Sequence, residues 1–299
     1  MTIRLLKNTL IPLTGILFLS AIIRLSFLET YPPGGPESLG LRMPSAIAGI
    51  GSIVLFMIVV GRLTRNKLLT LISGLVLTLN PWHIEQSRVQ SEVMLGLVVL
   101  LVMLVILLHV KNKIFIALTL CGALLIFYLV YPSFWLFHSI FKLPPLTFYM
   151  QNVFKLISIE FIFFKNDTFW SGGLRILGVL LPATLPLFFY GVYSSIKHWS
   201  GRSTLLLIPA IFILLVAAAN PKFPEGREFF LITPYLAYFL SVGISETFKI
   251  YKNVGIWFKV MAVLYFAVVL YEHLLFFHLY TVHYSGRISG EIPYAERNF

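Results

Sequence analysis

Nine long apolar stretches dominate this sequence and leave few kinds of fold open to it. They span residues 10–28, 41–61, 68–80, 93–109, 114–137, 174–196, 205–219, 229–248 and 254–279. With 58% hydrophobic and only 12% charged residues, the chain is too apolar for a soluble domain. Because a bilayer interior offers no water to an open backbone, and no alternating pattern typical of a β-barrel occurs, each stretch is expected to be a helix. We therefore predict an all-α integral membrane protein that crosses the membrane several times.

The lengths of the stretches predict about nine transmembrane helices in a single domain covering residues 1–299. Residues 68–80 form the shortest stretch, since 13 residues of helix rise only about 20 Å against a hydrocarbon core of roughly 30 Å. We expect this segment to be a broken helix or one buried in protein. The first stretch is long enough to span and lacks a following cleavage site, so it is expected to be an uncleaved helix.

The positions of the basic residues predict the orientation of these helices. With the N-terminus placed in the cytoplasm, the inside segments total 32 residues with eleven cations and no acid. The outside segments total 89 residues with eight cations and ten acids, a cation density about fourfold lower. Positive residues are retained on the cytoplasmic side, so this alternation predicts a cytoplasmic N-terminus and an outside C-terminus. It also accounts for most of the net charge of +11, and no nucleic-acid partner is expected.

Residues 81–88 form a polar octet, Pro-Trp-His-Ile-Glu-Gln-Ser-Arg, between two apolar stretches. A membrane segment that ends in Pro81 and Trp82 and then carries His83, Glu85 and Arg88 is expected to place these groups at the bilayer surface, where lipid-linked phosphates lie. Trp82 is expected to belong to the aromatic belt at that surface.

Two further outer segments complete the predicted outer face, which holds ten of the twelve acidic residues. Residues 29–40 are rich in proline and glycine and present Glu37 on a turn. Phe154, Ile157, Phe161 and Phe164 recur at helical spacing, which predicts a helix lying on the membrane surface. Chemistry that needs a carboxylate is therefore expected outside the cell or in a lumen.

The order of several motifs resembles that of the GT-C polytopic glycosyltransferases, which include the protein O-mannosyltransferases and the bacterial aminoarabinose transferases. The resemblance lies in residues 41–49, residues 80–88 with Glu92, residues 152–164 with Asp167, and residues 226–243. It is strongest over residues 41–243. The family carries an acidic pair in a long first outer loop, whereas this chain has Pro36-Glu37 there and passes directly into its second apolar stretch.

The resemblance implies transfer of a sugar from a polyprenyl-phosphate carrier to an acceptor on the outer membrane face, by an inverting mechanism. Glu37 would then be the catalytic base, while Arg88 and Arg227 would bind the phosphate that leaves. Glu85 and His83 would belong to the substrate-binding site. No cofactor and no histidine metal site are predicted, although a divalent metal held by outer carboxylates remains compatible with the sequence.

Each of these residues also has a structural interpretation. Arg88 would anchor a helix at the interface and pair with Glu85 or Glu92, and Arg24 and Glu272 would form an ion pair within the membrane. Two other functions stay open: a catalytically inactive remnant that binds lipid or a partner subunit, and a transporter or flippase, for which broken helices and intramembrane Glu272 are the indications.

Overall fold

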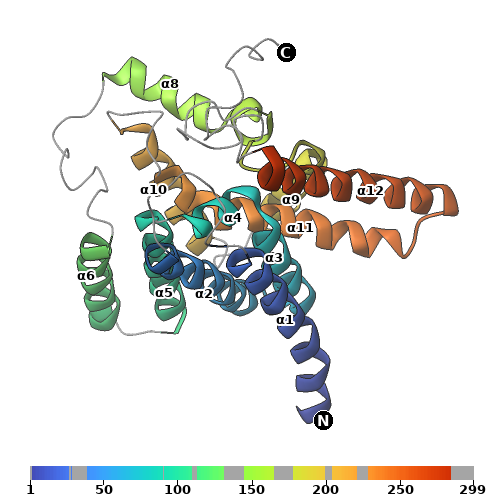
Figure 1. Ribbon diagram of the computed structural model, residues 1–299, viewed down its shortest axis with the longest axis horizontal. Coiled ribbons are helices and arrows are strands. Elements are labelled where there is room, and N and C mark those ends of the chain that lie inside the picture. Colours follow the sequence, from blue (N-terminus) through green and yellow to red (C-terminus); the bar gives the residue numbers. More distant parts are fainter. Residues whose placement is uncertain are drawn as a thin grey trace.

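A computed structural model of the protein describes residues 2–26, 28, 39–89, 91–109, 113–130, 145–164, 178–198, 204–220 and 228–283. Every regular element in these ranges is helical, as predicted (Figure 1). Each of the nine apolar stretches contains an α-helix. In chain order these are α1 (Thr2–Leu25), α2 (Leu39–Thr64), α3 (Lys67–Leu79), α5 (Glu92–His109), α6 (Lys113–Val130), α9 (Leu185–Lys197), α10 (Thr204–Ala218), α11 (Thr233–Tyr251) and α12 (Ile256–His278).

Four segments within the described ranges are long and apolar enough to cross a membrane, which indicates a membrane protein. They are Arg42–Thr64, Glu92–His109, Phe229–Tyr251 and Ile256–Val282. Three shorter apolar helices accompany them: Ile11–Leu25, Lys67–Leu79 and Leu206–Ala218. Helix lengths therefore support a multi-pass protein, and they do not by themselves support all nine predicted spans.

The remaining elements are short. They are α4 (Pro81–Arg88), α8 (Leu146–Leu156), the π-helices η1 (Glu160–Phe164) and η4 (Leu279–His283), and the 3₁₀ helices η2 (Pro182–Thr184) and η3 (Glu228–Ile232). The predicted surface helix corresponds to α8 and η1, with a break between them. Phe154, Ile157 and Phe164 are exposed, as a stripe facing lipid requires, whereas Phe161 turns inward and is buried.

Close backbone contact holds α9 against α11. A Cβ atom added to Gly191 would lie 1.8 Å from the carbonyl oxygen of Phe239, and one added to Gly243 would lie 1.8 Å from that of Leu187. No side chain fits at either position, so the two helices meet through their glycines. This crossing fixes the second half of the bundle, while α2 packs on α3 and α5 in the first half.

The last described helix, α12, contrasts with the rest of the bundle because most of its side chains are exposed. Within the described part of α12 and η4, only Phe276 and Tyr280 are buried. Glu272 Oε2 accepts a hydrogen bond from the backbone N–H of Ala183 at 2.8 Å, and the hydroxyl of Tyr265 donates to the Ala183 carbonyl at 2.5 Å. Two local attachments therefore hold α12, one at η2 and one at its C-terminal end.

Candidate functional site

The polar octet forms a short helix, α4, that begins abruptly after α3. Pro81 restricts the preceding residue to an extended conformation, and Asn80 accordingly has φ −65° and ψ 124°. The Asn80 side chain then caps the new helix by accepting a hydrogen bond from the backbone N–H of His83 at 2.9 Å, with Pro81 in the first turn. The third apolar stretch, expected to be a broken or protein-buried helix, forms one continuous helix, α3, which ends at Leu79, and α4 begins two residues later at Pro81.

All eight residues of α4 are buried within the protein. The expectation that the octet is displayed at the bilayer surface is therefore wrong in that respect. The reason is that α1, α2, α3 and α5 all pack against α4, and α1 and α2 supply hydrogen-bonding groups that replace water. Figure 1 shows α4 near the middle of the assembly.

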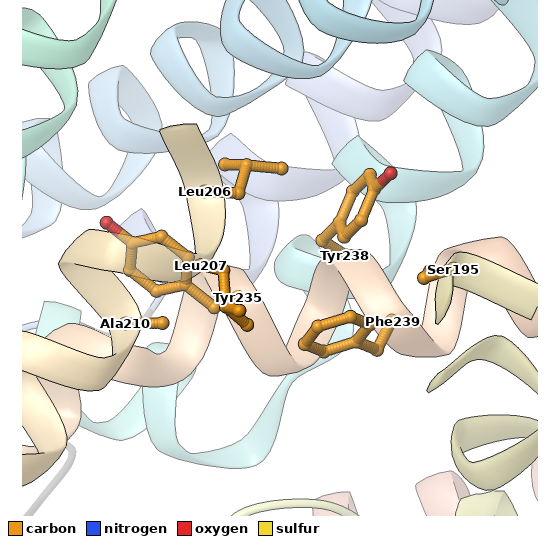
Figure 2. Close-up of a pocket in the computed structure, with 7 residues that line it drawn as sticks. All are labelled: Ser195, Leu206, Leu207, Ala210, Tyr235, Tyr238 and Phe239. Atoms are coloured by element: carbon orange, nitrogen blue, oxygen red, sulfur yellow. The ribbon is translucent and has the colours of Figure 1, made fainter. Parts of the chain in front are cut away.

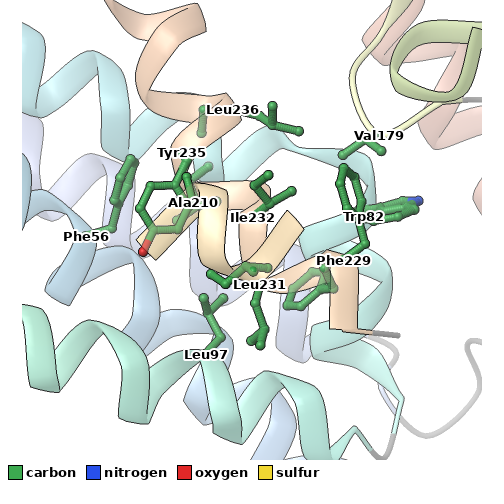
Figure 3. Close-up of a cluster of buried hydrophobic side chains, with 14 of the residues drawn as sticks. Phe56, Trp82, Leu97, Val179, Ala210, Phe229, Leu231, Ile232, Tyr235 and Leu236 are labelled. Carbon is green, nitrogen blue, oxygen red and sulfur yellow. The ribbon is translucent and has the colours of Figure 1, made fainter. Parts of the chain in front are cut away.

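Trp82 illustrates the same correction. It is buried between Phe161, Phe229 and Phe230, with ring centroids 6.1 to 6.5 Å apart. Figure 3 shows Trp82 within the main cluster of buried hydrophobic side chains, beside Val179 and Phe229. Trp82 is therefore a core residue and not a member of an interfacial aromatic belt.

His83 is enclosed by two polar partners from other helices. The Arg24 guanidinium lies 2.6 Å from Nδ1, and Ser52 Oγ lies 2.8 Å from Nε2. Because arginine can only donate, Nδ1 must accept, so Nε2 carries the hydrogen and donates to Ser52. The Ser52 hydroxyl in turn donates to the Gly49 carbonyl at 2.8 Å. Burial and the charge of Arg24 lower the pKa of His83 well below its usual value, which keeps the ring neutral.

Arg24 connects four helices from the centre of this region, where it is fully buried. Its guanidinium donates to the Ser20 hydroxyl at 3.1 Å and to the Thr78 carbonyl at 3.3 Å, besides its contact with His83. Gly49 makes room for it, since a Cβ atom there would lie 3.2 Å from Arg24 Nε and 2.5 Å from Ser87 Cβ. Among the described residues these partners are all uncharged. The predicted ion pair between Arg24 and Glu272 is therefore wrong, because Glu272 binds the Ala183 N–H instead.

Arg88 and Glu85 lie one turn apart on α4, on a different side from His83. Arg88 donates to the Ile23 carbonyl near the end of α1, and its guanidinium carbon lies 5.9 Å from the centroid of the Tyr280 ring. Glu85 Oε1 is buried and has no hydrogen-bond partner among the described residues. Burial raises the pKa of Glu85 to about 8, so its carboxyl is largely protonated at neutral pH.

Two residues that the sequence did not assign to the site complete this cluster. Arg42 is buried at the start of α2 and donates to the Leu28 carbonyl at 3.1 Å. Tyr280 comes from η4, almost two hundred residues away from α4 in the sequence, and its buried ring lies against the Arg88 guanidinium. Arg42 was visible only as part of a family motif, and nothing in the sequence marked Tyr280.

The other two predicted site residues, Glu37 and Arg227, lie outside the described residues. The structure thus brings together three of the five: His83, Glu85 and Arg88. Within the described ranges, no group of three or more His, Cys, Asp or Glu side chains is placed to hold a metal ion.

The chemistry of the cluster follows from its charges. Two guanidinium groups, a carboxyl that is largely protonated and a phenol are buried on α2, α4 and η4, and the Arg88 guanidinium lies against the Tyr280 ring. Guanidinium groups bind phosphate through paired N–H donors, and a protonated carboxyl or a phenol can add a further donor. The cluster is therefore suited to an anion with several oxygen atoms.

A separate, partly open cavity lies between α9, α10 and α11, with a volume of about 20 Å³, which is room for little more than a water molecule. Figure 2 shows its lining, which consists of Ser195, Leu206, Leu207, Ala210, Tyr235, Tyr238 and Phe239. The lining is mainly apolar. The hydroxyls of Ser195 and Tyr235 are buried without a hydrogen-bond partner among the described residues.

Comparisons with known proteins give no match, since no family model, no curated protein and no solved structure resembles this chain significantly.

Proposed function

We propose that the chain crosses the membrane nine times, with its N-terminus in the cytoplasm and its C-terminus outside. A helix in each apolar stretch and the excess of cations in the inside segments support this arrangement. In a prokaryote the protein would reside in the plasma membrane as an integral, multi-pass protein.

Cysteine labelling in sealed vesicles tests the orientation. Cys121 is the only cysteine, so Cys121→Ser provides a blank background into which Lys67→Cys and Lys155→Cys can be introduced separately. Both positions are exposed. A membrane-impermeant maleimide added to the outer face is expected to label position 155 and to leave position 67 unlabelled until the vesicles are opened. The reverse pattern would refute the orientation and, with it, an outer active site.

We infer that the protein transfers a sugar from a polyprenyl-phosphate carrier to an acceptor at the outer membrane face. The observation that carries this proposal is the burial of Arg42, Glu85 and Arg88 among apolar helices, with the Tyr280 ring against the Arg88 guanidinium. Burying guanidinium groups is expensive, so a cluster of this kind is more often found where an anion is recognised. The ordered motifs shared with the GT-C glycosyltransferases support the same substrate class.

In this proposal the leaving phosphate develops negative charge, which Arg88 stabilises, while Glu37 takes the proton of the acceptor hydroxyl. Glu85 contacts the sugar or the phosphate through its available oxygen, and Arg227 supplies a second guanidinium. Both ring nitrogens of His83 are engaged, so His83 contributes by holding α4 in position unless one of these bonds opens.

A transfer assay with purified protein and radiolabelled polyprenyl-phosphate sugars tests the reaction. Wild-type protein is expected to release polyprenyl phosphate and to label an acceptor, and Glu37→Gln is expected to lower turnover by at least a hundredfold. Arg88→Lys keeps the charge but loses bidentate contact, so it should raise KM or lower kcat by a smaller factor. Unchanged turnover in Glu37→Gln would exclude Glu37 as the base.

A second candidate function is a non-catalytic subunit that binds polyprenyl phosphate or a partner protein. One observation favours it: Arg88 and His83 are both engaged in internal hydrogen bonds, as in a structural core. This candidate predicts that polyprenyl phosphate binds, that Arg88→Ala weakens the binding, and that no preparation transfers sugar.

The break between α3 and α4 is also compatible with a transporter or flippase, because discontinuous helices commonly line transport sites. Its other indication is removed, since Glu272 has a structural partner in Ala183. Lipid flux measured in sealed vesicles separates transport from transfer.

A further inference from the structure

Tyr280 occupies an unusual position for a residue at the end of a lipid-exposed helix. Its side chain is only 3% exposed, and its ring stacks on Phe276 with centroids 5.7 Å apart. The Arg88 guanidinium carbon lies 5.9 Å from the same ring's centroid. The phenol ring thus contacts both an aromatic ring of α12 and a cation of α4.

The charged groups around Tyr280 come from elements that are distant in the sequence. Arg42 belongs to α2, while Glu85 and Arg88 belong to α4, and all three side chains are buried. Two of these three groups are cations. A phenol among guanidinium groups adds an O–H donor to a site whose other donors are N–H groups, which suits an oxyanion.

The local structure at the end of α12 places Tyr280 against Arg88. The helix changes to a π-helix at Leu279, and short π-helical turns are uncommon and occur frequently at functional sites. Phe276 and Tyr280 pack on Ile84 and Leu181 in a small hydrophobic cluster separate from the main core. The hydrogen bonds of Glu272 and Tyr265 with the Ala183 backbone hold α12 in place before this point, and Glu272 lies about two turns before Tyr280. They fix the direction in which the end of α12 approaches α4.

We propose that Tyr280 is a recognition residue of the anion site, donating its phenol hydroxyl to a phosphate oxygen of the lipid carrier that Arg42 and Arg88 bind. This inference rests on the proposed function and assigns to the site a residue from the opposite end of the chain. The ring also supports the Arg88 guanidinium in its bound orientation, and Phe276 supports the ring in turn.

Binding measurements with protein in nanodiscs test this role, using polyprenyl phosphate, polyprenol and inorganic phosphate as probes. Tyr280→Phe removes only the hydroxyl and keeps the ring stacked on Phe276, so the variant is expected to keep the wild-type fold. It should bind polyprenyl phosphate roughly tenfold or more weakly, as expected for one hydrogen bond to a charged group. Its affinity for polyprenol should equal that of the wild type. Tyr271→Phe, on the exposed side of the same helix, is the matched control and should leave all affinities unchanged.

The outcomes separate this inference from the proposal on which it rests. If wild-type protein binds polyprenyl phosphate no more tightly than polyprenol, phosphate recognition fails and both are overturned. If the wild type prefers the phosphate and Tyr280→Phe keeps the full preference, only the role of Tyr280 is overturned. If inorganic phosphate binds as tightly as the lipid and with the same dependence on Tyr280, the residue keeps its role and the lipid carrier is the part that fails.

Discussion

Two helix junctions in this protein are held together in opposite ways. At the crossing of α9 and α11, Gly191 and Gly243 bring the two backbones into contact without any polar side chain. At the junction of α1, α2, α3 and α4, Arg24, His83 and Ser52 form a buried chain of hydrogen bonds. The first junction requires residues without side chains, whereas the second requires matched hydrogen-bond donors and acceptors. They should therefore respond to different substitutions.

The largest loss of stability is expected at the α9–α11 crossing, where there is no space for a side chain. Gly243→Val should destabilise the protein by about 3 kcal/mol or more, because its Cβ atom would overlap the Leu187 carbonyl oxygen. Unfolding in mixed detergent micelles measures the change. Gly51→Val serves as the control, since nothing lies within 4 Å of a Cβ atom at that position of α2. Equal losses in the two variants would show that the α9–α11 crossing is not close-packed.

The second largest loss of stability is expected from a substitution in the polar junction. Arg24→Met leaves His83 Nδ1 and the Thr78 carbonyl without their donor, which should cost about 2 to 3 kcal/mol of unfolding free energy. The same unfolding measurement applies. Arg62→Met, at an exposed position of α2, should have no measurable effect. A more stable Arg24→Met protein would mean that burying the charge costs more than its hydrogen bonds return.

Glu85 gives the polar junction a pH dependence that the glycine crossing lacks. Its pKa is about 8 in the folded protein and near 4.5 when exposed, so the unfolded state loses this proton first as pH rises. Stability should therefore fall between about pH 4.5 and pH 8, by at most roughly 1.4 kcal/mol per pH unit. Melting temperature against pH measures this, and Glu85→Gln should flatten the profile.

The control for this pH profile is Glu92→Gln, which changes an exposed carboxyl at the start of α5. It should keep the wild-type slope. If Glu85→Gln retains that slope as well, another group is responsible for the pH dependence and Glu85 is ionised in the folded protein.

The smallest effect is expected at Ser52. Ser52→Ala removes the acceptor of the His83 Nε2–H and should cost about 1 kcal/mol. Ser73→Ala is the matched control, because this equally buried serine only donates to the Leu69 carbonyl of its own helix. Similar losses in both variants would show that the Ser52–His83 bond adds nothing to stability.

The polar octet shows how far the sequence went in locating the site. Its composition marked His83, Glu85 and Arg88 correctly as unusual residues in an apolar chain. Their surroundings could not be predicted, because the partners Arg24, Arg42 and Tyr280 lie up to about two hundred residues away. The same groups were expected at the bilayer surface and are instead buried. The hydropathy of a residue measures its preference for water, but it does not predict whether neighbouring helices will supply hydrogen bonds in place of that water.

The sequence by itself determined an all-helical membrane protein, since only helices can satisfy the backbone within the long apolar stretches. It also determined that α3 must end before Pro81, because a proline disfavours helical backbone angles at the residue that precedes it. Only the tertiary structure decided which polar groups meet. Hydrogen bonds such as Arg24 to His83, and the approach of Tyr280 to Arg88, depend on how helices distant in the chain pack. Local sequence carries no record of that packing, since the same apolar surface can pack against several different neighbours.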